Sequence, residues 1–412
     1  MKKRITVITA GHLSTCPRML KAADALAEEG HDVHLVSTRS TAWASDADQA
    51  VLKRRRDRWQ WSVVDYTRQG APLTYVTSGV KQKLARSVSR FRSTIPFRVA
   101  AKALFRVHDH LVRAALATKA DFFYGGTVGA MGATFESATR TGCEYALDLE
   151  DFYSGDHPED AKLTRLVERV ETETVGGARF LTAASAGIAN VYRSSFGVEP
   201  VVINNTFPLP SQVPRTAPSG GPLKLYWFSQ TIGRGRGLED AVEALRRAGI
   251  PAELHLRGNA DTDFVAHLES FVSKDAPNLR LVVHAPASPD EMVELLADFD
   301  VGLATEQGAS VNREVCLTNK ALTYILGGLA LVMTETTGHR PLIEDLSEAS
   351  IHYPPGDVDA LASGLRRLAD EPSFLERCRR ASWEAATRRW HWEHSEERGR
   401  LVRLFAFEAM EE

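Results

Sequence analysis

Short apolar runs alternate along this chain with longer segments of helical periodicity. Ile5 to Ala10 is apolar, and a loop at 11–17 separates it from an amphipathic segment at 18–29. The next apolar run is Val33 to Ser37. Short buried strands separated by amphipathic helices are typical of βαβ units with a parallel sheet. The opening of the chain therefore predicts an α/β protein.

The same alternation continues to the carboxyl end. Further strands are predicted at 121–124, 145–149, 180–184, 201–203, 223–228, 253–256, 279–283, 300–304 and 329–333. Further helices are predicted at 163–175, 186–196, 238–248, 357–369 and 372–388, at the capping box of Ser288, Pro289 and Glu291, and in the tail. Residues 40–80 are poorly patterned, although Leu73 to Thr77 favours a strand. Residues 81–113 predict helical pieces with a break near Pro96.

A segment rich in proline and glycine divides the chain almost in half. It contains Pro208, Pro210, Pro214, Pro218, Gly220, Gly221 and Pro222. Such a cluster predicts a linker at 208–222 between domains at 1–207 and 223–387. Two doubly wound domains joined in this way predict a cleft between them, where small ligands usually bind.

Composition narrows the class of protein. At 412 residues, two domains are expected, and 43% hydrophobic with 25% charged residues is typical of a soluble globular protein. A formal net charge of −3 gives no reason to expect nucleic acid as a partner. The four scattered cysteines predict no disulfide framework, which favours a cytoplasmic setting. We expect no signal peptide and no membrane-spanning segment.

Residues 300–334 organise the second half of the chain. An apolar strand, Asp300 to Ala304, leads into a polar loop, and a helix then begins after Thr318. In open α/β sheets, ligands bind at the carboxyl ends of strands. The start of a helix offers free backbone N–H groups and a partial positive charge, which suit a phosphate.

A basic span covers residues 81–113, with nine lysines and arginines and one acid, Asp109. The span can be a solvated helix face, or it can bind an anionic membrane or a phosphate-bearing acceptor. Nucleic acid fits less well, since aromatic residues are sparse there.

Three acidic residues crowd the end of the strand at 145–149. Asp148, Glu150 and Asp151 can raise one another's pKa, which is one way to make a catalytic acid or base. Alternatively, some of them cap the next helix or pair with a basic residue. His12, in the first loop, is another candidate, or else an ordinary loop histidine.

The linker and the segments SQTIGRGRGLEDAVEAL and NREVCLTNKALTYILGGLALV resemble the GT-B glycosyltransferases, and among them those of glycosyltransferase family 4. The resemblance covers nearly the whole chain. It implies two Rossmann-like domains facing a cleft, with a terminal helix at 388–412, beginning near Trp390, Trp392 and Glu393, that packs back on the first domain. It also implies transfer of a sugar from a nucleotide diphosphate sugar, with retention of anomeric configuration.

The resemblance assigns the donor diphosphate to the loop after the first strand of the second domain. Arg236, before Gly237, stands at the family's lysine position, and Thr231 stands at its arginine position. Gly233 and Arg234 belong to the same loop, and Arg234 can compensate for Thr231. A guanidinium group suits a diphosphate geometrically.

The family's pair of glutamates, eight residues apart, has two possible registers here. Glu306 and Glu314 have the spacing, whereas counting back from Gly328 puts Thr323 at the second position. We therefore expect Glu306 near the sugar. Residues expected at the diphosphate and ribose are Asn319, Lys320 and Thr323, with Asn312 and Arg313 as further members of the site. Arg236, Lys320, Glu306 and Asp151 are the expected catalytic residues.

Other parts of the resemblance are less complete. The nucleotide base is expected near Gly258 and Asn259 and near Pro286. Where many family members have a catalytic histidine, this chain has Gly125, Gly126 and Thr127. The Asp-x-Asp pairs fall in ordinary positions for aspartate, so we expect no metal requirement.

The resemblance leaves donor and acceptor open. The donor is expected to be a UDP-, GDP- or TDP-sugar, and the acceptor a glycan, a lipid-linked molecule or a small molecule. The basic span at 81–113 would allow peripheral contact at the inner face of the membrane. Two alternatives remain, a nucleotide-sugar 2-epimerase and a non-catalytic scaffold in polysaccharide assembly.

Overall fold

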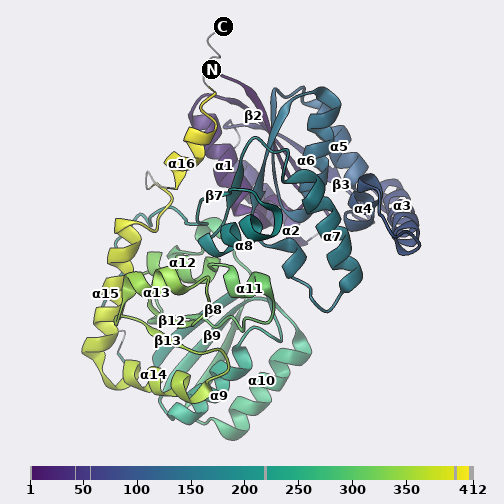
Figure 1. The fold of residues 1–412 in the computed structure, drawn as a ribbon. Helices are drawn as coiled ribbons and strands as arrows, with labels where there is room; N and C mark the ends of the chain where they lie inside the picture. The colour runs from purple at the N-terminus through teal and green to yellow at the C-terminus, as the bar shows by residue number, and fades with distance from the viewer. Residues whose placement is uncertain (1, 42, 56, 218–219, 394–396, 408–412) are drawn as a thin grey trace. The chain divides into compact units, whose positions relative to one another are not determined.

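The computed structural model describes residues 2–41, 43–55, 57–217, 220–393 and 397–407. The chain forms two compact units (Figure 1). The amino-terminal unit contains residues 1–203 and 398–412, and the carboxyl-terminal unit contains residues 204–397.

A seven-stranded parallel sheet is the centre of the amino-terminal unit, with the order β3-β2-β1-β4-β5-β6-β7. Its strands are β1 (Arg4–Thr9), β2 (Asp32–Arg39), β3 (Gln60–Asp65), β4 (Phe122–Gly126), β5 (Glu144–Leu149), β6 (Leu181–Ala183) and β7 (Val201–Val202). The central strands are almost wholly buried, as expected for a parallel sheet covered on both faces. The order reverses between β1 and β4, so the ends of these two strands form the switch point of this sheet.

Helices connect and cover these strands. They are α1 (Pro17–Glu28), α2 (Trp43–Arg54), α3 (Pro72–Arg90), α4 (Phe97–Leu104), α5 (His108–Ala117), α6 (Val128–Thr141), α7 (Ala161–Thr174), α8 (Ala186–Phe196) and the terminal α16 (Arg398–Leu404). The segment after α16 returns to the sheet, where Phe405 packs edge-on against Phe122 and Tyr124 of β4. Arg398 forms ion pairs with Glu28 and Glu29 at the end of α1.

The carboxyl-terminal unit repeats the plan with six parallel strands in the order β10-β9-β8-β11-β12-β13. They are β8 (Leu223–Ile232), β9 (Ala252–Ala260), β10 (Leu279–His284), β11 (Val301–Ala304), β12 (Ala330–Thr334) and β13 (Ile351–Tyr353). Its helices are α9 (Leu238–Ala248), α10 (Thr262–Asp275), α11 (Val311–Val315), α12 (Asn319–Leu326), α13 (Arg340–Leu346), α14 (Val358–Asp370) and α15 (Pro372–Arg388). The switch point of this sheet lies between β8 and β11.

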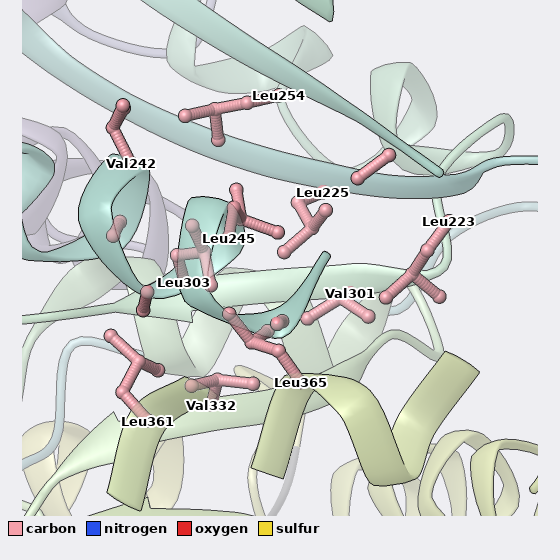
Figure 2. Packing of buried hydrophobic residues seen from close by; sticks show 14 of the residues in the cluster. Leu223, Leu225, Val242, Leu245, Leu254, Val301, Leu303, Val332, Leu361 and Leu365 are labelled. Carbon is pink, nitrogen blue, oxygen red and sulfur yellow. The ribbon is translucent and has the colours of Figure 1, made fainter. Parts of the chain in front are cut away.

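Branched aliphatic side chains fill the core of the carboxyl-terminal unit. Figure 2 shows strand residues such as Leu225 and Val301 between α9, which contributes Val242 and Leu245, and α14. Leu322 and Ile325 of α12 pack in a second buried cluster. Because both clusters are buried, and protein interiors are close-packed, the loops at the strand ends start from a rigid support.

The linker segment is fixed to the carboxyl-terminal unit by a buried arginine. Arg379 of α15 donates to the carbonyl oxygens of Arg215 at 2.5 Å and Ala217 at 3.3 Å. It also forms an ion pair of 2.7 Å with Asp300, next to the start of β11. The first and last residues of the carboxyl-terminal unit also contact each other. Glu397 accepts hydrogen bonds from the backbone and side-chain nitrogens of Asn204, each at 2.7 Å.

Several predicted elements differ from those observed. Leu73 to Thr77 is not a strand but the first part of α3, because Pro72 begins a helix whose inner face packs on α4. The poorly patterned region contains α2 and β3, neither of which was predicted. The capping box at 288–291 begins only a 3₁₀ turn. The terminal helix is short, since Trp390, Trp392 and Glu393 precede α16 without helical structure.

Among the described residues, no helix has the length and apolar character needed to cross a bilayer.

Candidate functional site

Three loops of the carboxyl-terminal unit meet at the carboxyl edge of its sheet. They follow β8, β11 and β12, which are neighbours or near neighbours around the switch point. The start of α12 lies at the same edge, because α12 follows the loop after β11 and runs back to the beginning of the parallel strand β12. Most of the site residues that the sequence predicts lie on these segments.

The loop after β8 is held close to the end of β11. Gly237 has φ +73°, and a Cβ atom there would clash with the carbonyl oxygen of Thr305, so the position requires glycine. Thr305 in turn donates its hydroxyl to the carbonyl of Arg236 at 3.1 Å. The Arg236 guanidinium donates to Ser229 Oγ at 3.0 Å, and Arg313 donates to the carbonyl of Gly235 at 2.8 Å. These bonds bring two predicted arginines to one loop.

Glu306 and Lys320 form an ion pair in the centre of this region. Each side chain is only 13% exposed. Nε2 of His339, a fully buried residue at the start of α13, lies 3.8 Å from Glu306 Oε2. Oε2 itself is buried and accepts no hydrogen bond from the described residues. The structure therefore brings together two predicted catalytic residues and one that the sequence analysis missed.

The charge states of this cluster follow from its contacts. Burial by itself raises the pKa of Glu306, but the opposing charge of Lys320 outweighs burial and holds the pKa below its usual range. Burial lowers the pKa of His339. His339 Nδ1 must carry the proton, because its partner at 2.9 Å is the carbonyl oxygen of Thr334. At neutral pH we therefore assign an ionised Glu306 and a neutral His339.

The polar side chains at the start of α12 differ in whether they are already hydrogen-bonded within the protein. Thr318 is the N-cap and accepts from the backbone of Ala321 at 3.5 Å. Asn319 Oδ1 accepts from Asn205 Nδ2 at 2.8 Å. Thr323 is buried, and its hydroxyl donates to the carbonyl of Asn319 at 2.7 Å within the helix. Thr323 therefore lies behind the helix start, with its proton already engaged.

The remaining predicted donor residues lie around this centre. Arg234 is exposed, 3.8 Å from Glu239. Asn312 is buried in α11. Glu314 Oε1 accepts from the backbone and hydroxyl of Thr337, at 2.9 and 2.7 Å, so this carboxylate holds the loop before α13. The two glutamates therefore have different partners. Glu306 pairs with Lys320, whereas Glu314 binds Thr337.

The two segments predicted to contact a base lie side by side. Gly258 is in the extended part of β9, where a Cβ atom would clash with the carbonyl of Ser229. Asn259 donates to the carbonyl of Gln230 at 3.1 Å. Arg257 reaches across to the carbonyl of Ala285 at 2.7 Å, next to the exposed Pro286.

In the amino-terminal unit, Asp148 has a structural partner. Arg18 of α1 forms two hydrogen bonds to its carboxylate, at 2.7 and 2.5 Å, and a third, at 2.7 Å, to the carbonyl of Ile203. Thr182 donates to the same carboxylate at 2.5 Å. Of the two interpretations of the acidic cluster, pairing with a basic residue is what the structure shows for Asp148.

Glu150 behaves differently from Asp148. Burial, reinforced by the charge of Asp151, raises the pKa of Glu150 to about 8. A carboxyl group that is protonated near neutral pH can donate a hydrogen bond or act as an acid. Asp151 is half-buried at the end of β5, and its backbone carbonyl accepts from Tyr192 at 3.3 Å.

The raised pKa of Glu150 predicts a pH effect on stability. The folded carboxyl binds its proton up to pH about 8, whereas the unfolded one releases it near 4.5. Stability contributed by this group is therefore present below pH 4.5 and is lost as the pH rises through 8. We expect Glu150→Gln to raise the unfolding midpoint at pH 8.5 and to change it little at pH about 4. An equal change at both pH values would contradict the assignment.

His12 and Thr127 lie at the switch point of the amino-terminal sheet. His12 is buried, with Nδ1 2.8 Å from Asp48 and Nε2 accepting from the backbone of Ser40 and Thr41. It is a fixed loop histidine rather than an open base. Thr127, at the start of α6, has φ +79°, a strained conformation for a branched residue. Its hydroxyl accepts from the backbone of Ala10 at 3.1 Å.

One aspartate of each Asp-x-Asp pair has a structural partner. Asp48 holds His12, Asp261 caps α10, and Asp300 pairs with Arg379. No group of three or more potential metal ligands occurs within the described ranges.

No protein-family model matches this chain, and no curated protein matches its sequence. Solved structures match it over almost the full length of both chains. HepE from Anabaena, in complex with UDP and glucose, has a TM-score of 0.71 and 14% identity, covering 98% of this chain and 100% of that one. Sucrose-phosphate synthase from Thermosynechococcus elongatus has a TM-score of 0.70 and 14% identity, with the same coverage.

A third structure is a variant of TarM from S. aureus, with fondaparinux, α-GlcNAc-glycerol and UDP. Its TM-score is 0.67 at 9% identity, covering 98% of this chain and 100% of that one. At such identities the similarity establishes the fold and not the activity. The chain has the GT-B fold, with two Rossmann-like α/β units.

Proposed function

We propose that this protein is a glycosyltransferase that uses a nucleotide diphosphate sugar and binds it at the carboxyl edge of the β8–β13 sheet. The observation that carries this proposal is the buried Glu306–Lys320 pair beside the Arg236 loop, at the switch point. A UDP-sugar is the first donor to test, because structures with this fold contain UDP or UDP-glucose.

The charges at this edge suit a diphosphate. Arg236 offers a planar guanidinium, Lys320 an ammonium group, and the start of α12 free backbone N–H groups. Glu306 holds Lys320 in place, and its ionised carboxylate can accept hydrogen bonds from sugar hydroxyls. Asn319, beside Lys320, supplies a neutral amide for the diphosphate or ribose.

In the proposed reaction, an acceptor hydroxyl oxygen bonds to C1 of the sugar as the bond between C1 and the diphosphate oxygen breaks. Arg236 and Lys320 stabilise the negative charge that develops on the leaving diphosphate. The proton of the hydroxyl passes to the leaving phosphate oxygen, so no protein base is required. We propose retention of configuration and no metal requirement.

We assign acceptor binding to the amino-terminal unit. Glu150 and Asp151 at the end of β5, with the strained Thr127, are the polar groups of that unit that we expect to face an acceptor. The acceptor is proposed to be a glycan, a lipid-linked molecule or a small molecule, with no role for nucleic acid. The four cysteines are free thiols, which suits the cytoplasmic setting of this proposal.

Thermal unfolding in the presence of UDP-, GDP-, TDP- and ADP-sugars, with and without Mg²⁺, tests donor binding. A ligand at about 100 times its dissociation constant adds roughly 2.7 kcal/mol of stability. We expect one nucleotide to stabilise the protein without Mg²⁺. Arg236→Ala should weaken its binding about 10- to 150-fold, since a charge-assisted hydrogen bond contributes about 1.5–3 kcal/mol.

Arg246→Ala is the matched control, because Arg246 lies on α9 and pairs with Glu243 at 2.7 Å, away from the site. It should bind the donor like the wild type.

If no nucleotide sugar stabilises the wild type, the donor-binding proposal fails. Donor binding without release of nucleoside diphosphate in the presence of acceptors would favour the scaffold alternative. Thr231 and Thr323 are consistent with a scaffold, because they stand where the family has an arginine and a glutamate. Epimerised donor without acceptor would favour the 2-epimerase.

A further inference from the structure

Helix α3 carries a stripe of large apolar side chains that face solvent. Leu73 is 81% exposed, Leu84 61% and Phe91, the C-cap, 88%. The other members of the stripe are Val76, Val80 and Val88. At 3.6 residues per turn these six positions share one face about 120° wide. A continuous exposed apolar face of this kind marks an interaction surface.

The opposite face of α3 fixes which way the stripe points. Gln82 and Arg86 donate to the carbonyl of Ala103 in α4, at 3.1 and 3.0 Å. Arg106 donates to Ser78 Oγ at 3.1 Å, and its guanidinium lies 4.6 Å from the ring centre of Tyr75. Figure 1 shows α3 on the outer side of α4 within the amino-terminal unit. The helix therefore packs by its polar face and turns its apolar face outward.

Basic residues flank the apolar stripe on both sides. Residues 72–92 contain five lysines and arginines and no acidic residue, in a chain whose net charge is −3. By helical position, Lys83 and Arg90 border one edge of the stripe, and Lys81 borders the other. Arg92 follows the end of the helix. Within the described part of the chain, Lys83, Arg90 and Arg92 form no ion pair, whereas Lys81 is 3.8 Å from Asp109.

The basic residues of α4, which belong to the same span, have acidic partners. Arg98 pairs with Glu136 at 3.3 Å, and Lys102 pairs with Asp109 at 3.0 Å. These contacts engage the charges of α4 within the unit. On α3, by contrast, Lys83 and Arg90 are exposed beside the apolar stripe and have no ion-pair partner among the described residues.

We propose that α3 is a membrane-docking helix that lies in the interface of an anionic bilayer. The apolar stripe would enter the boundary between headgroups and acyl chains, and the flanking lysines and arginines would contact lipid phosphates. A protein groove would satisfy the apolar stripe but would give no reason for basic residues on both edges. This surface is independent of the donor site, so either proposal can fail while the other holds.

Co-sedimentation of the full chain with lipid vesicles tests this proposal. The protein should bind phosphatidylcholine vesicles that contain phosphatidylglycerol and should bind pure phosphatidylcholine at least about tenfold more weakly. Binding should fall as NaCl rises to about 0.5 M, because screening weakens the contacts to phosphate.

Two variants separate the contribution of the apolar stripe to vesicle binding from that of the basic residues. The triple variant Leu73→Ser, Leu84→Ser and Phe91→Ser should lose binding at every salt concentration. Lys83→Gln with Arg90→Gln should lose mainly the preference for anionic vesicles. The charge control is Lys162→Gln with Lys274→Gln, two exposed lysines elsewhere, and the apolar control is Val213→Ser, at a residue 74% exposed. Both controls should bind like the wild type.

All of these positions are exposed, so unfolding midpoints should stay near that of the wild type, which makes a loss of binding interpretable. Vesicle binding that is absent in the wild type, or unchanged in the triple variant, would overturn the proposal. A dimer in solution that the triple variant converts to monomer, without vesicle binding, would identify the stripe as a contact between copies instead.

Discussion

Replacing Lys320 by methionine should lower the free energy of unfolding by about 3–5 kcal/mol, the usual cost of removing one partner of a buried ion pair. Glu306 would keep a buried charge, since its side chain is 13% exposed and Oε2 already has no hydrogen-bond partner among the described residues. Chemical denaturation followed by tryptophan fluorescence measures this loss, and Trp227, whose ring lies 5.6 Å from Lys320 Nζ, is one of the seven tryptophans that report it.

The double variant Lys320→Met with Glu306→Gln should recover most of that loss, because it leaves no unpaired charge. Without Lys320, burial should raise the pKa of Glu306. The destabilisation by Lys320→Met should therefore be smaller at pH 5 than at pH 8, since protonation removes the buried charge. Lys274→Met, at an exposed position of α10, is the control. A loss below about 1 kcal/mol for Lys320→Met would show that the pair behaves like a surface ion pair.

Replacing Arg18 by methionine should have an equally large effect on the amino-terminal unit, again about 3–5 kcal/mol. The side chains of Arg18 and Asp148 are only 6% and 2% exposed, and two hydrogen bonds join them. Without Arg18, the Asp148 carboxylate has no positive charge paired with it, although Thr182 still donates a hydrogen bond to it at 2.5 Å. Denaturation by urea at pH 7 measures the loss, and Arg18→Met with Asp148→Asn should recover part of it.

The variant Asp148→Asn distinguishes a structural aspartate from a catalytic one. If Asp148 supports the fold, Asp148→Asn should lower stability while turnover of the folded fraction stays within about threefold of the wild type. Retained stability with turnover lost by a factor of about a hundred or more would identify Asp148 as a catalytic group instead.

The fold was predictable because its strands and helices differ in length and period. Runs such as Ile5 to Ala10 are too short and too apolar for surface helices, and the segments between them repeat at helical spacing. Leu73 to Thr77 was misassigned because β-branched residues favour strands, whereas the hydrogen bonds of α3 to α4 decide its conformation. In addition, the apolar residues of α3 face solvent and its polar residues face α4, which is the reverse of the pattern expected for a helix that packs on a core.

The candidate site was predictable only where chain position determines it. Arg236 and Glu306 follow strands, so topology alone brings them to one edge of the sheet. Lys320 opens the next helix and meets Glu306 for the same reason. His339 and the Arg18–Asp148 pair could not be found in this way, because they depend on packing between segments far apart in sequence. Asp148 and its partner Arg18 are 130 residues apart in sequence, so no local pattern indicates their pairing.

Hydrogen–deuterium exchange of the full chain, with and without the stabilising nucleotide sugar, tests most directly where the donor binds. We expect protection of backbone amides at 229–237 and 305–323, because these segments carry Arg236, Glu306 and Lys320. The same protection should be reduced in Arg236→Ala at equal donor concentration. Protection confined to other segments, with 229–237 and 305–323 unchanged at saturating donor, would contradict the assignment of the donor site.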